Sequence, residues 1–158
     1  MTNDNAHDPH AELGAETFLS ATDLRTYVSR HRRAEHDDEL AQRQKAAAAR
    51  RQLIDRLSQR IEITDALIAD CTQRIREAAE AGKSEILMLR FPSDMCTDRG
   101  RAINNQEPGW ERTLIGVPRQ VVEFWEEQLR PRGFHCRARI LDYPDGMPGD
   151  VGMFYAWD

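Results

Sequence analysis

The segment REAAEAGKSEILMLRF, residues 76–91, contains the point at which the chain changes character. Between Gly14 and Gly82 there is no Gly and no Pro, whereas every other Gly, and every Pro except Pro9, falls at or after residue 82. Gly82 is typical of the residue just past the end of a helix, where a left-handed backbone conformation is needed. The residues that follow it, EILMLRF (85–91), are apolar on both faces and predict a central strand.

This division predicts an α+β protein in three parts. We expect an acidic, flexible N-terminus over residues 1–19, a long helical segment over 20–82 and a compact domain over 83–158. The helical segment is either one coiled-coil-like helix or a helical hairpin. The compact domain is predicted to have the order β-α-β-β and two layers.

The start of the helical segment has a capping signal. Ser20 is a suitable N-cap, and Asp23 stands three residues later as in a capping box. If unbroken, the segment would be roughly 90 Å long at 1.5 Å per residue, which is more than a small domain can cover. We therefore expect it to pair with another helix or to bend, and two stretches suit a break: HRRAEHDDEL (31–40) and RIEITDALI (60–68), where Thr64 would cap a second helix.

A heptad pattern in the second half of this segment favours helix pairing. Ile occupies every a position and the d positions are mixed, and the pattern runs through Ile54, Leu57, Ile61, Thr64, Ile68, Cys71, Ile75 and Ala78. β-branched residues at a favour two-stranded coils. We therefore predict self-association through Ile54, Leu57, Ile61, Ile68, Cys71 and Ile75, although the same stripe would also fit against a sheet.

The remaining elements of the compact domain follow from periodicity and turn residues. VPRQVVEFWEEQL (117–129) predicts a helix that begins near Pro118, and FHCRARILDY (134–143) alternates like a half-buried strand. VGMFYAW (151–157) follows a turn-rich segment and predicts the second strand of a hairpin. This last strand is apolar on both faces, so we expect it to lie either in a subunit interface or under the long helix.

Composition excludes several classes of protein. Hydrophobic residues make up 40 % of the 158 residues and charged residues 31 %, and no run approaches the roughly 18 apolar residues of a membrane span. The first residues, MTNDNAHDPHAE, lack the pattern of a secretory signal. The chain has three cysteines, a small and odd number that argues against a disulfide framework. We expect a cytoplasmic protein without membrane contact, and the scarcity of Lys beside abundant Arg and Ala suggests a bacterial genome of biased composition.

The charge distribution argues against general nucleic-acid binding. Residues 1–20 carry four acidic and no basic side chains, residues 21–83 have a net charge of +2 and residues 84–158 of −3, for a total of −5. No segment has the strong basic footprint of a nucleic-acid binder. A regulatory, nucleic-acid-associated protein that uses RHRR (30–33) and ARRQ (49–52) is the weakest alternative.

The long connection after the first predicted strand is the best candidate site, because long connections in compact domains are often functional. It includes FPSDMCTDRGRAINNQEPGW (91–110), and part of it, TDRGRAINN, is expected to form a short helix with Ile103 under Trp110. The residues we select as candidates for contact with a ligand or partner are Asp94, Cys96, Asp98, Arg99, Arg101, Asn104, Trp110, Arg137 and Arg139.

Two kinds of chemistry are open to these residues. Cys96 could act as a thiolate with Arg99 or Arg101 beside it and His135 as base, although a cysteine is more often a small buried hydrophobe. Alternatively, Arg99 and Arg101 with Arg137 and Arg139 could bind an anion, although arginines on a strand face more often keep it soluble. We expect no cofactor and no metal, because His135 and Cys136 are adjacent and so point to opposite faces of a strand.

Weighing these patterns, we expect a non-enzymatic cytoplasmic protein that self-associates through its helical segment as a homodimer or higher oligomer. Its α+β domain would present a binding surface to a protein partner. A small enzyme or an anion-binding domain is the alternative. The sequence contains no dinucleotide fingerprint, phosphate-binding glycine loop or serine nucleophile motif that would favour an enzyme.

Overall fold

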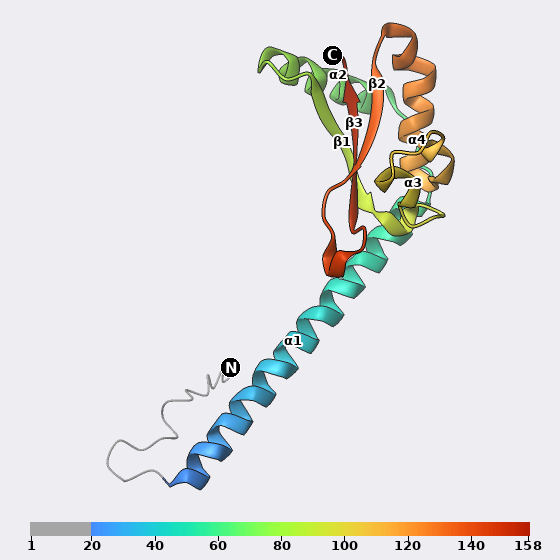
Figure 1. Cartoon of the computed structure of the whole chain (residues 1–158). Helices are drawn as coiled ribbons and strands as arrows, with labels where there is room; N and C mark the ends of the chain where they lie inside the picture. The colour runs from blue at the N-terminus through green and yellow to red at the C-terminus, as the bar shows by residue number, and fades with distance from the viewer. Residues whose placement is uncertain (1–19) are drawn as a thin grey trace. The chain divides into compact units, whose positions relative to one another are not determined.

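The computed structural model describes residues 20–158, so the predicted flexible N-terminus (1–19) lies outside the described residues. The chain divides into two units, residues 1–46 and residues 47–158. Helix α1 (Ala21–Ser58) supplies residues to both units. The second unit contains the other helices and all the strands of the described chain, and its architecture confirms the predicted α+β fold (Figure 1).

Helix α1 begins at the predicted capping box. The Asp23 N–H donates to Ser20 Oγ at 3.1 Å, and the Ser20 N–H donates to Asp23 Oδ2 at 3.3 Å. Both groups would otherwise be unpaired donors of the first turn. The helix continues without interruption through residues 31–40, so a break there, which the sequence had left open, does not occur. Within the first unit its side chains are exposed, apart from the half-buried Tyr27, which stacks on His31.

The helical segment breaks at the second of the two expected places. Helix α1 ends at Ser58, and α2 (Asp65–Glu80) begins after the N-cap Thr64, whose side chain accepts a hydrogen bond from the Leu67 N–H. Helix α2 stops before Gly82, which has the expected left-handed φ of 76°. The predicted heptad pattern is therefore not one continuous stripe, because residues 59–64 are not helical.

The three strands form one antiparallel sheet in the order β1-β3-β2 (Figure 1). Strand β1 (Glu85–Pro92) and strand β2 (His135–Ile140) each pair with β3 (Asp150–Ala156). The β2–β3 hairpin was predicted correctly. The prediction that residues 85–91 form the central strand is wrong: the last strand occupies the centre, and its apolar residues on both faces are explained by that position.

The connection from β1 to β2 holds the remaining helices. Helix α3 (Arg101–Asn104) confirms the short helix expected in the long connection. Helix α4 (Gly116–Phe124) begins two residues before Pro118, which still lies in the first turn, where its missing N–H costs no hydrogen bond. A π-helical turn, Trp125–Leu129, extends α4. Short 3₁₀ turns occur within the connection at Ser93–Met95, Trp110–Thr113 and Arg130–Arg132, and a further one, Pro144–Gly146, lies between β2 and β3.

The core lies on one face of the sheet. It brings together residues from all three strands, the long connection and α4, and its fully buried members include Phe91, Met95, Val122, Val151 and Met153. Ile103 and Trp110 belong to the same cluster, as expected. The last turns of α1 complete it, because Ile54 and Leu57 pack against these buried residues.

Two contacts hold the C-terminal turns of α1 in the second unit. The Arg50 guanidinium pairs with Asp94 at 3.0 Å and with Asp150 at 3.3 Å. Gly116 has a φ of 60°, and a Cβ built on it would lie 2.2 Å from the Leu57 carbonyl oxygen. Glycine is therefore required at residue 116 for α4 to begin beside the end of α1.

Candidate functional site: an apolar groove between two helices

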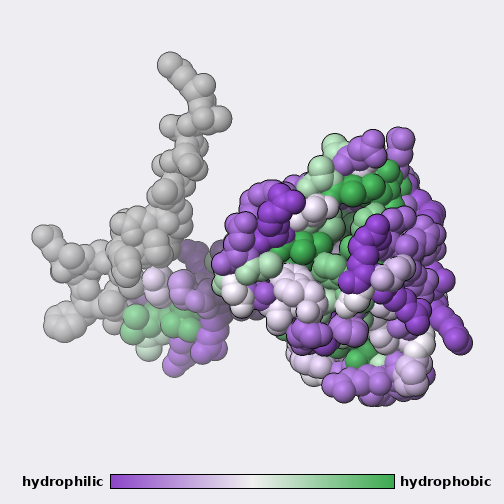
Figure 2. Space-filling model, turned by 90° about the horizontal axis from the view of Figure 1, so that it is seen from above, coloured by the Kyte–Doolittle hydropathy of each residue, from purple (hydrophilic) through white to green (hydrophobic). Residues whose placement is uncertain are grey.

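Exposed isoleucine and leucine side chains gather between α2 and α4. Ile61 is 47 % exposed, Ile63 43 %, Leu67 44 % and Ile68 39 %. They border a groove of about 110 Å³ whose lining is almost entirely apolar. We call this surface, together with its continuation described below, the α2–α4 groove. Figure 2 shows one face of the molecule, on which green hydrophobic surface interrupts the purple hydrophilic surface in several places.

The sheet and α4 provide the floor and one wall of the groove. Val117, Val121 and Phe124 line it from α4, and Met88 and Tyr155 line it from the sheet. Tyr155 is 2 % exposed, and its hydroxyl donates to the Val121 carbonyl at 2.7 Å. Burial raises the pKa of this phenol, so it stays neutral. The hydroxyl thus joins the central strand to α4 beneath the groove.

Gln120 of α4 holds the segment between α1 and α2, residues 59–64, against that helix. Gln120 is 6 % exposed, and its amide forms a reciprocal pair with the Ile61 backbone. The Ile61 N–H donates to Gln120 Oε1 at 2.9 Å, and Gln120 Nε2 donates to the Ile61 carbonyl at 2.8 Å. Because this segment lacks helical hydrogen bonds, Gln120 satisfies backbone groups that α1 and α2 cannot.

An ion pair supports the same segment. Arg60 contacts Glu123 at 2.6 Å, and Arg119 contacts the other oxygen of this carboxylate at 3.4 Å. The hydrogen bond from Arg60 is the main reason that the pKa of Glu123 is lowered. The side chains of Ile61 and Ile63 are thus presented by a non-helical segment that is fixed at Arg60 and at the Ile61 backbone.

The groove continues along α2 toward the end of α4. This part encloses about 330 Å³, and Ile68, Cys71 and Phe124 line both parts. Ile75 and Leu129 extend the apolar lining. Burial raises the pKa of the Cys71 thiol, which keeps it protonated at neutral pH.

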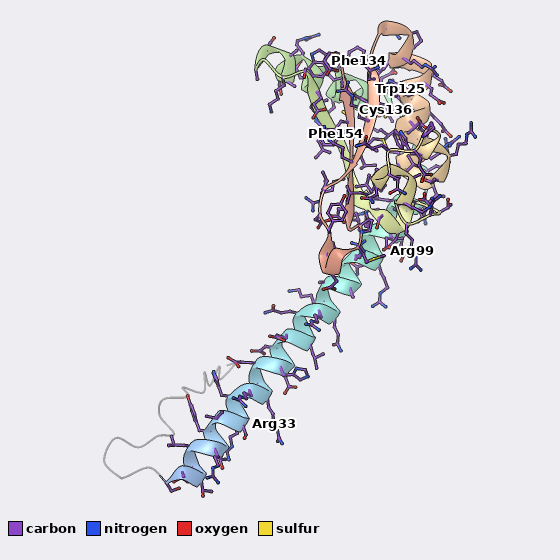
Figure 3. All side chains as sticks on the ribbon, viewed as in Figure 1. Arg33, Arg99, Trp125, Phe134, Cys136 and Phe154 are labelled. Carbon is purple, nitrogen blue, oxygen red and sulfur yellow. The ribbon has the colours of Figure 1, made fainter. Side chains whose placement is uncertain are left out.

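A hydrogen bond fixes the far end of the groove. The indole N–H of Trp125 donates to the Phe134 carbonyl at 2.9 Å, and this bond ties the π-helical turn to the start of β2. In Figure 3, Trp125, Phe134 and Cys136 lie close together at this end of the sheet. Cys136 faces the core, and burial raises its pKa to about 12.

The six residues predicted for self-association separate into two sets. Ile54 and Leu57 pack against the core of their own chain, so their side chains are already covered and do not form an open surface. Ile61, Ile68, Cys71 and Ile75 instead line the groove. The prediction that all six form one coiled-coil face is corrected by the break after Ser58, which places the two sets on different elements.

The long connection does not present Cys96 to solvent. Cys96 is 3 % exposed and belongs to the hydrophobic core. Burial is the main reason that its pKa rises to about 11, so almost no thiolate exists at neutral pH. This placement corrects the expectation that Cys96 contacts a ligand: it is the small buried hydrophobe that the sequence had left as an alternative.

The other candidates in this connection stabilise the connection itself. Asp98 accepts hydrogen bonds from the Gly100 N–H at 3.0 Å and the Ala102 N–H at 2.8 Å. Asn104 Oδ1 accepts one from the Tyr143 hydroxyl at 2.7 Å. Asp94 pairs with Arg50, as described above, and Trp110 packs against the core. None of these contacts requires a ligand.

The four arginines proposed for anion binding do not form one site. Arg101 pairs with Glu107 at 3.0 Å, while Arg99 has a left-handed φ of 56°. On the face of the sheet opposite the core, Arg137 makes two hydrogen bonds to Asp158, and Arg139 pairs with Glu85. The Arg139 guanidinium also lies 3.9 Å from the centre of the Phe154 ring. The strand arginines are thus neutralised by their own chain.

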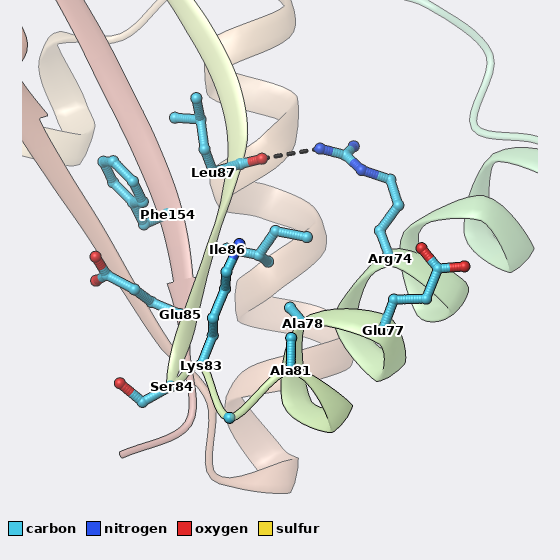
Figure 4. A pocket seen from close by; sticks show the side chains of 11 residues that line it. Arg74, Glu77, Ala78, Ala81, Lys83, Ser84, Glu85, Ile86, Leu87 and Phe154 are labelled. Atoms are coloured by element: carbon cyan, nitrogen blue, oxygen red, sulfur yellow. Dashed lines mark hydrogen bonds between the residues drawn. The ribbon is translucent and has the colours of Figure 1, made fainter.

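A second, more polar hollow lies between the C-terminal half of α2 and β1 (Figure 4). It encloses about 880 Å³ and is lined by side chains of both signs. Arg74 extends from α2 to the β1 edge, where it donates to the Leu87 carbonyl at 2.9 Å. This contact satisfies an edge carbonyl that has no partner strand, so the hollow is explained by the way α2 meets the sheet.

Sequence reasoning missed several residues of the α2–α4 groove, above all Ile63, Leu67 and Gln120. Ile63 and Leu67 fell outside the a and d positions of the predicted heptads. A uniform helical period cannot place Ile63, which precedes the N-cap Thr64, whereas Leu67 lies within α2 beside the a and d positions. Gln120 carried no signal, because a glutamine on a helix is usually exposed.

Comparisons with protein-family models, with curated proteins and with solved structures found no match for this chain. Within residues 20–158, no three His, Cys, Asp or Glu side chains cluster closely enough to hold a metal ion. In that same range, no helix has the length and apolar character needed to cross a membrane.

Proposed function

We propose that this chain is a non-enzymatic, cytoplasmic interaction protein that self-associates and uses the α2–α4 groove as its binding surface. The observation that carries the proposal is the group of exposed side chains Ile61, Ile63, Leu67 and Ile68 around one apolar hollow. Contiguous exposed apolar surface of this kind is typical of interaction sites. Each such side chain stabilises a complex by up to about 1.5–3 kcal/mol when it is fully buried.

The state of the cysteines supports a binding role in a reducing compartment. All three are free thiols. Burial raises the pKa of each, and Cys96, the cysteine of the long connection, lies in the core. A nucleophilic cysteine needs a lowered pKa, whereas the pKa of each of these thiols is raised, and Cys96 is in addition buried.

The alternatives that the sequence raised have less support. Anion binding needs cations that are free to pair with the ligand, but Arg101, Arg137 and Arg139 are each paired with a carboxylate of the chain. Nucleic-acid binding needs a concentrated positive field, and the net charge of the chain is −5.

Analytical ultracentrifugation of the full chain at micromolar concentration tests the proposal. We expect the wild-type protein to sediment as a dimer or higher oligomer, and the double variant Ile61→Asp, Ile68→Asp to sediment as a monomer. Both side chains are exposed, so the charges should not unfold the domain, and far-UV circular dichroism checks this. Met147→Asp is the matched control, because Met147 is 64 % exposed in a turn outside the groove. A wild-type monomer, unchanged by the double substitution, would refute self-association.

A further inference from the structure

Helix α1 carries an exposed apolar stripe in the first unit. Leu24 and Val28 are each 43 % exposed, and Tyr27 stacks on His31 with 6.1 Å between ring centres. These four residues have the spacing i, i+3, i+4 and i+7, so they share one face of the helix. This is the pattern by which an amphipathic helix fills an apolar groove.

The dimensions of this stripe fit the α2–α4 groove. From Leu24 to His31 the helix rises about 10 Å, and the groove follows α2 from Leu67 to Ile75 over about 12 Å, at 1.5 Å per residue. Apolar and aromatic side chains predominate on both surfaces, although Gln120, Thr72, Gln128 and Arg132 also line the groove. The capping box at Ser20 and Asp23 holds the helix in shape up to the first residue of the stripe.

The helices that carry the two surfaces have opposite net charge, although no carboxylate is among the residues that line the groove itself. Residues 21–33 of α1 contain Arg25, Arg30, Arg32 and Arg33 but only one acidic residue, Asp23. Helix α2 has the reverse balance, with Asp65, Asp70, Glu77 and Glu80 against Arg74 and Arg76. The wall formed by α4 and its π-helical turn is also acidic, with Glu123, Glu126 and Glu127 against Arg119.

We propose that the N-terminal part of α1 from a second copy of this chain, centred on Leu24 and Val28, binds in the α2–α4 groove. The inference rests on the proposed self-association, because it identifies the segment of the second copy that binds in the α2–α4 groove. In a reciprocal dimer each copy gives one helix and receives one, so both grooves are filled. Pairing of one groove with another is disfavoured, because it would bring two acidic α2 helices together.

Mixing two variants of the full chain tests this arrangement. Leu24→Asp, Val28→Asp removes the helix stripe and leaves the groove intact, whereas Ile68→Asp disrupts the groove and leaves the stripe intact. We expect each variant alone to sediment as a monomer at concentrations where the wild type is dimeric. An equimolar mixture should form a heterodimer through the one remaining intact contact, with a dissociation constant at least about tenfold higher than that of the wild type, a loss of about 1.4 kcal/mol.

Matched controls separate this effect from unfolding. Leu40→Asp places a charge at a leucine that is 42 % exposed on α1 outside the stripe, and it should leave the wild-type dimer unchanged. Circular dichroism should show unchanged helix content for every variant. Raising the sodium chloride concentration should weaken the wild-type dimer, because the arginines of α1 and the carboxylates of α2 would be screened.

The other outcomes identify what is wrong. If Leu24→Asp, Val28→Asp stays dimeric while Ile68→Asp is monomeric, the groove binds another surface, and the inference fails while self-association stands. If Ile68→Asp stays dimeric while the α1 variant is monomeric, α1 pairs with α1, and the groove is not the site. If both variants are monomeric and their mixture forms no heterodimer, binding of α1 from one copy in the groove of another is excluded. A monomeric wild type overturns both this inference and the proposed function.

Discussion

Gly116 determines how closely two helices of the second unit can approach. Its φ of 60° lies in the left-handed region, and a Cβ at this position would lie 2.2 Å from the Leu57 carbonyl oxygen and 2.8 Å from the Ser58 Cα. Both atoms belong to the backbone, so no side-chain rotation can relieve the overlap. The end of α1 and the start of α4 would have to separate, and Ile54 and Leu57 would lose part of their packing.

Gly116→Ala should therefore destabilise the domain by about 2–3 kcal/mol, from both overpacking and the left-handed conformation. Gly133→Ala is the control: its φ is 86°, but nothing lies within 4 Å of the added Cβ. It should cost only the conformational part, about 1 kcal/mol. Urea unfolding measures both. Equal losses would show that the close approach at Gly116 is unimportant.

Single residues also explain why the long connection was selected as a site from its sequence. Asp98 and Asn104 are polar side chains in a loop, and the same residue types bind ligands or satisfy loop backbone. In the structure the Asp98 carboxylate accepts hydrogen bonds from two backbone N–H groups, and the Asn104 side-chain oxygen accepts one from the Tyr143 hydroxyl. Sequence alone cannot separate these uses, because the partner of Asn104 lies 39 residues away.

At the scale of secondary-structure elements, the helix boundaries were predictable and the strand order was not. The caps at Ser20 and Thr64 are local signals, since each depends on residues within one turn. The structure has β3 in the centre of the sheet, where the sequence predicted β1. This order depends on pairing between residues about 60 positions apart, such as Arg90 and Gly152. No local pattern encodes such a choice, and an edge strand covered by α2 can be as apolar as a central one.

The contact between residues 59–64 and α4 should become less stable at acid pH. The pKa of Glu123 is lowered mainly by the hydrogen bond from Arg60, with a further contribution from Arg119. A carboxylate with a lowered pKa stabilises the fold above the pKa it has when unfolded, near 4.5, and this stabilisation is lost as the pH falls through the folded value. The carboxylate is 34 % exposed, so the effect should be only a few tenths of a kcal/mol up to about 1 kcal/mol.

Glu123→Gln should accordingly lower the free energy of unfolding at pH 7 and reduce its decline between pH 5 and pH 3. Urea titrations at a series of pH values give both quantities. Glu126→Gln, at an exposed glutamate with no ion pair among residues 20–158, is the matched control. An identical pH dependence for the wild type and Glu123→Gln would show that the ion pair does not stabilise this segment.

At the scale of the whole molecule, the candidate site joins segments that are distant in the sequence. Ile61 and Ile63 come from the connection between helices, Leu67 and Ile68 from α2, and Phe124 and Tyr155 from later elements. Periodicity identified an apolar stripe on residues 54–78, but it cannot tell which part of a stripe the chain itself covers. The domain takes Ile54 and Leu57 into its core, buries Ala78 and leaves Ile61 and Ile68 exposed.

Thiol alkylation should report on the occupancy of the groove. Cys71 lines it and is partly accessible, whereas Cys96 is 3 % exposed with a pKa near 11. The pKa of Cys96 leaves it about a hundredfold less thiolate at neutral pH than a free thiol has. Because Cys96 is also buried whereas Cys71 is half-exposed, it should react at least about tenfold more slowly than Cys71. Mass spectrometry after brief maleimide treatment distinguishes the two.

The alkylation rate of Cys71 should also fall as the protein concentration rises through the dissociation constant of the dimer. Leu24→Asp, Val28→Asp should remove this dependence, because no helix would then cover the groove. Cys96 serves as the internal reference, since its burial in the core does not depend on association. A Cys71 rate that is the same at all concentrations of the wild type would contradict occupancy of the groove.

The position of β3 has a consequence for biosynthesis. Strands β1 and β2 bond only to β3 within the sheet, and β3 follows both along the chain. A ribosome adding about 5–20 residues per second would therefore complete β1 about 3–12 s, and β2 about 0.5–2 s, before β3 begins to be made. During that interval the helices can form, but apolar strands such as EILMLRF remain unpaired and open to misassociation. Nascent chains that are interrupted before residue 150 would lack the sheet entirely, so the cell would encounter them as substrates for chaperones or proteases.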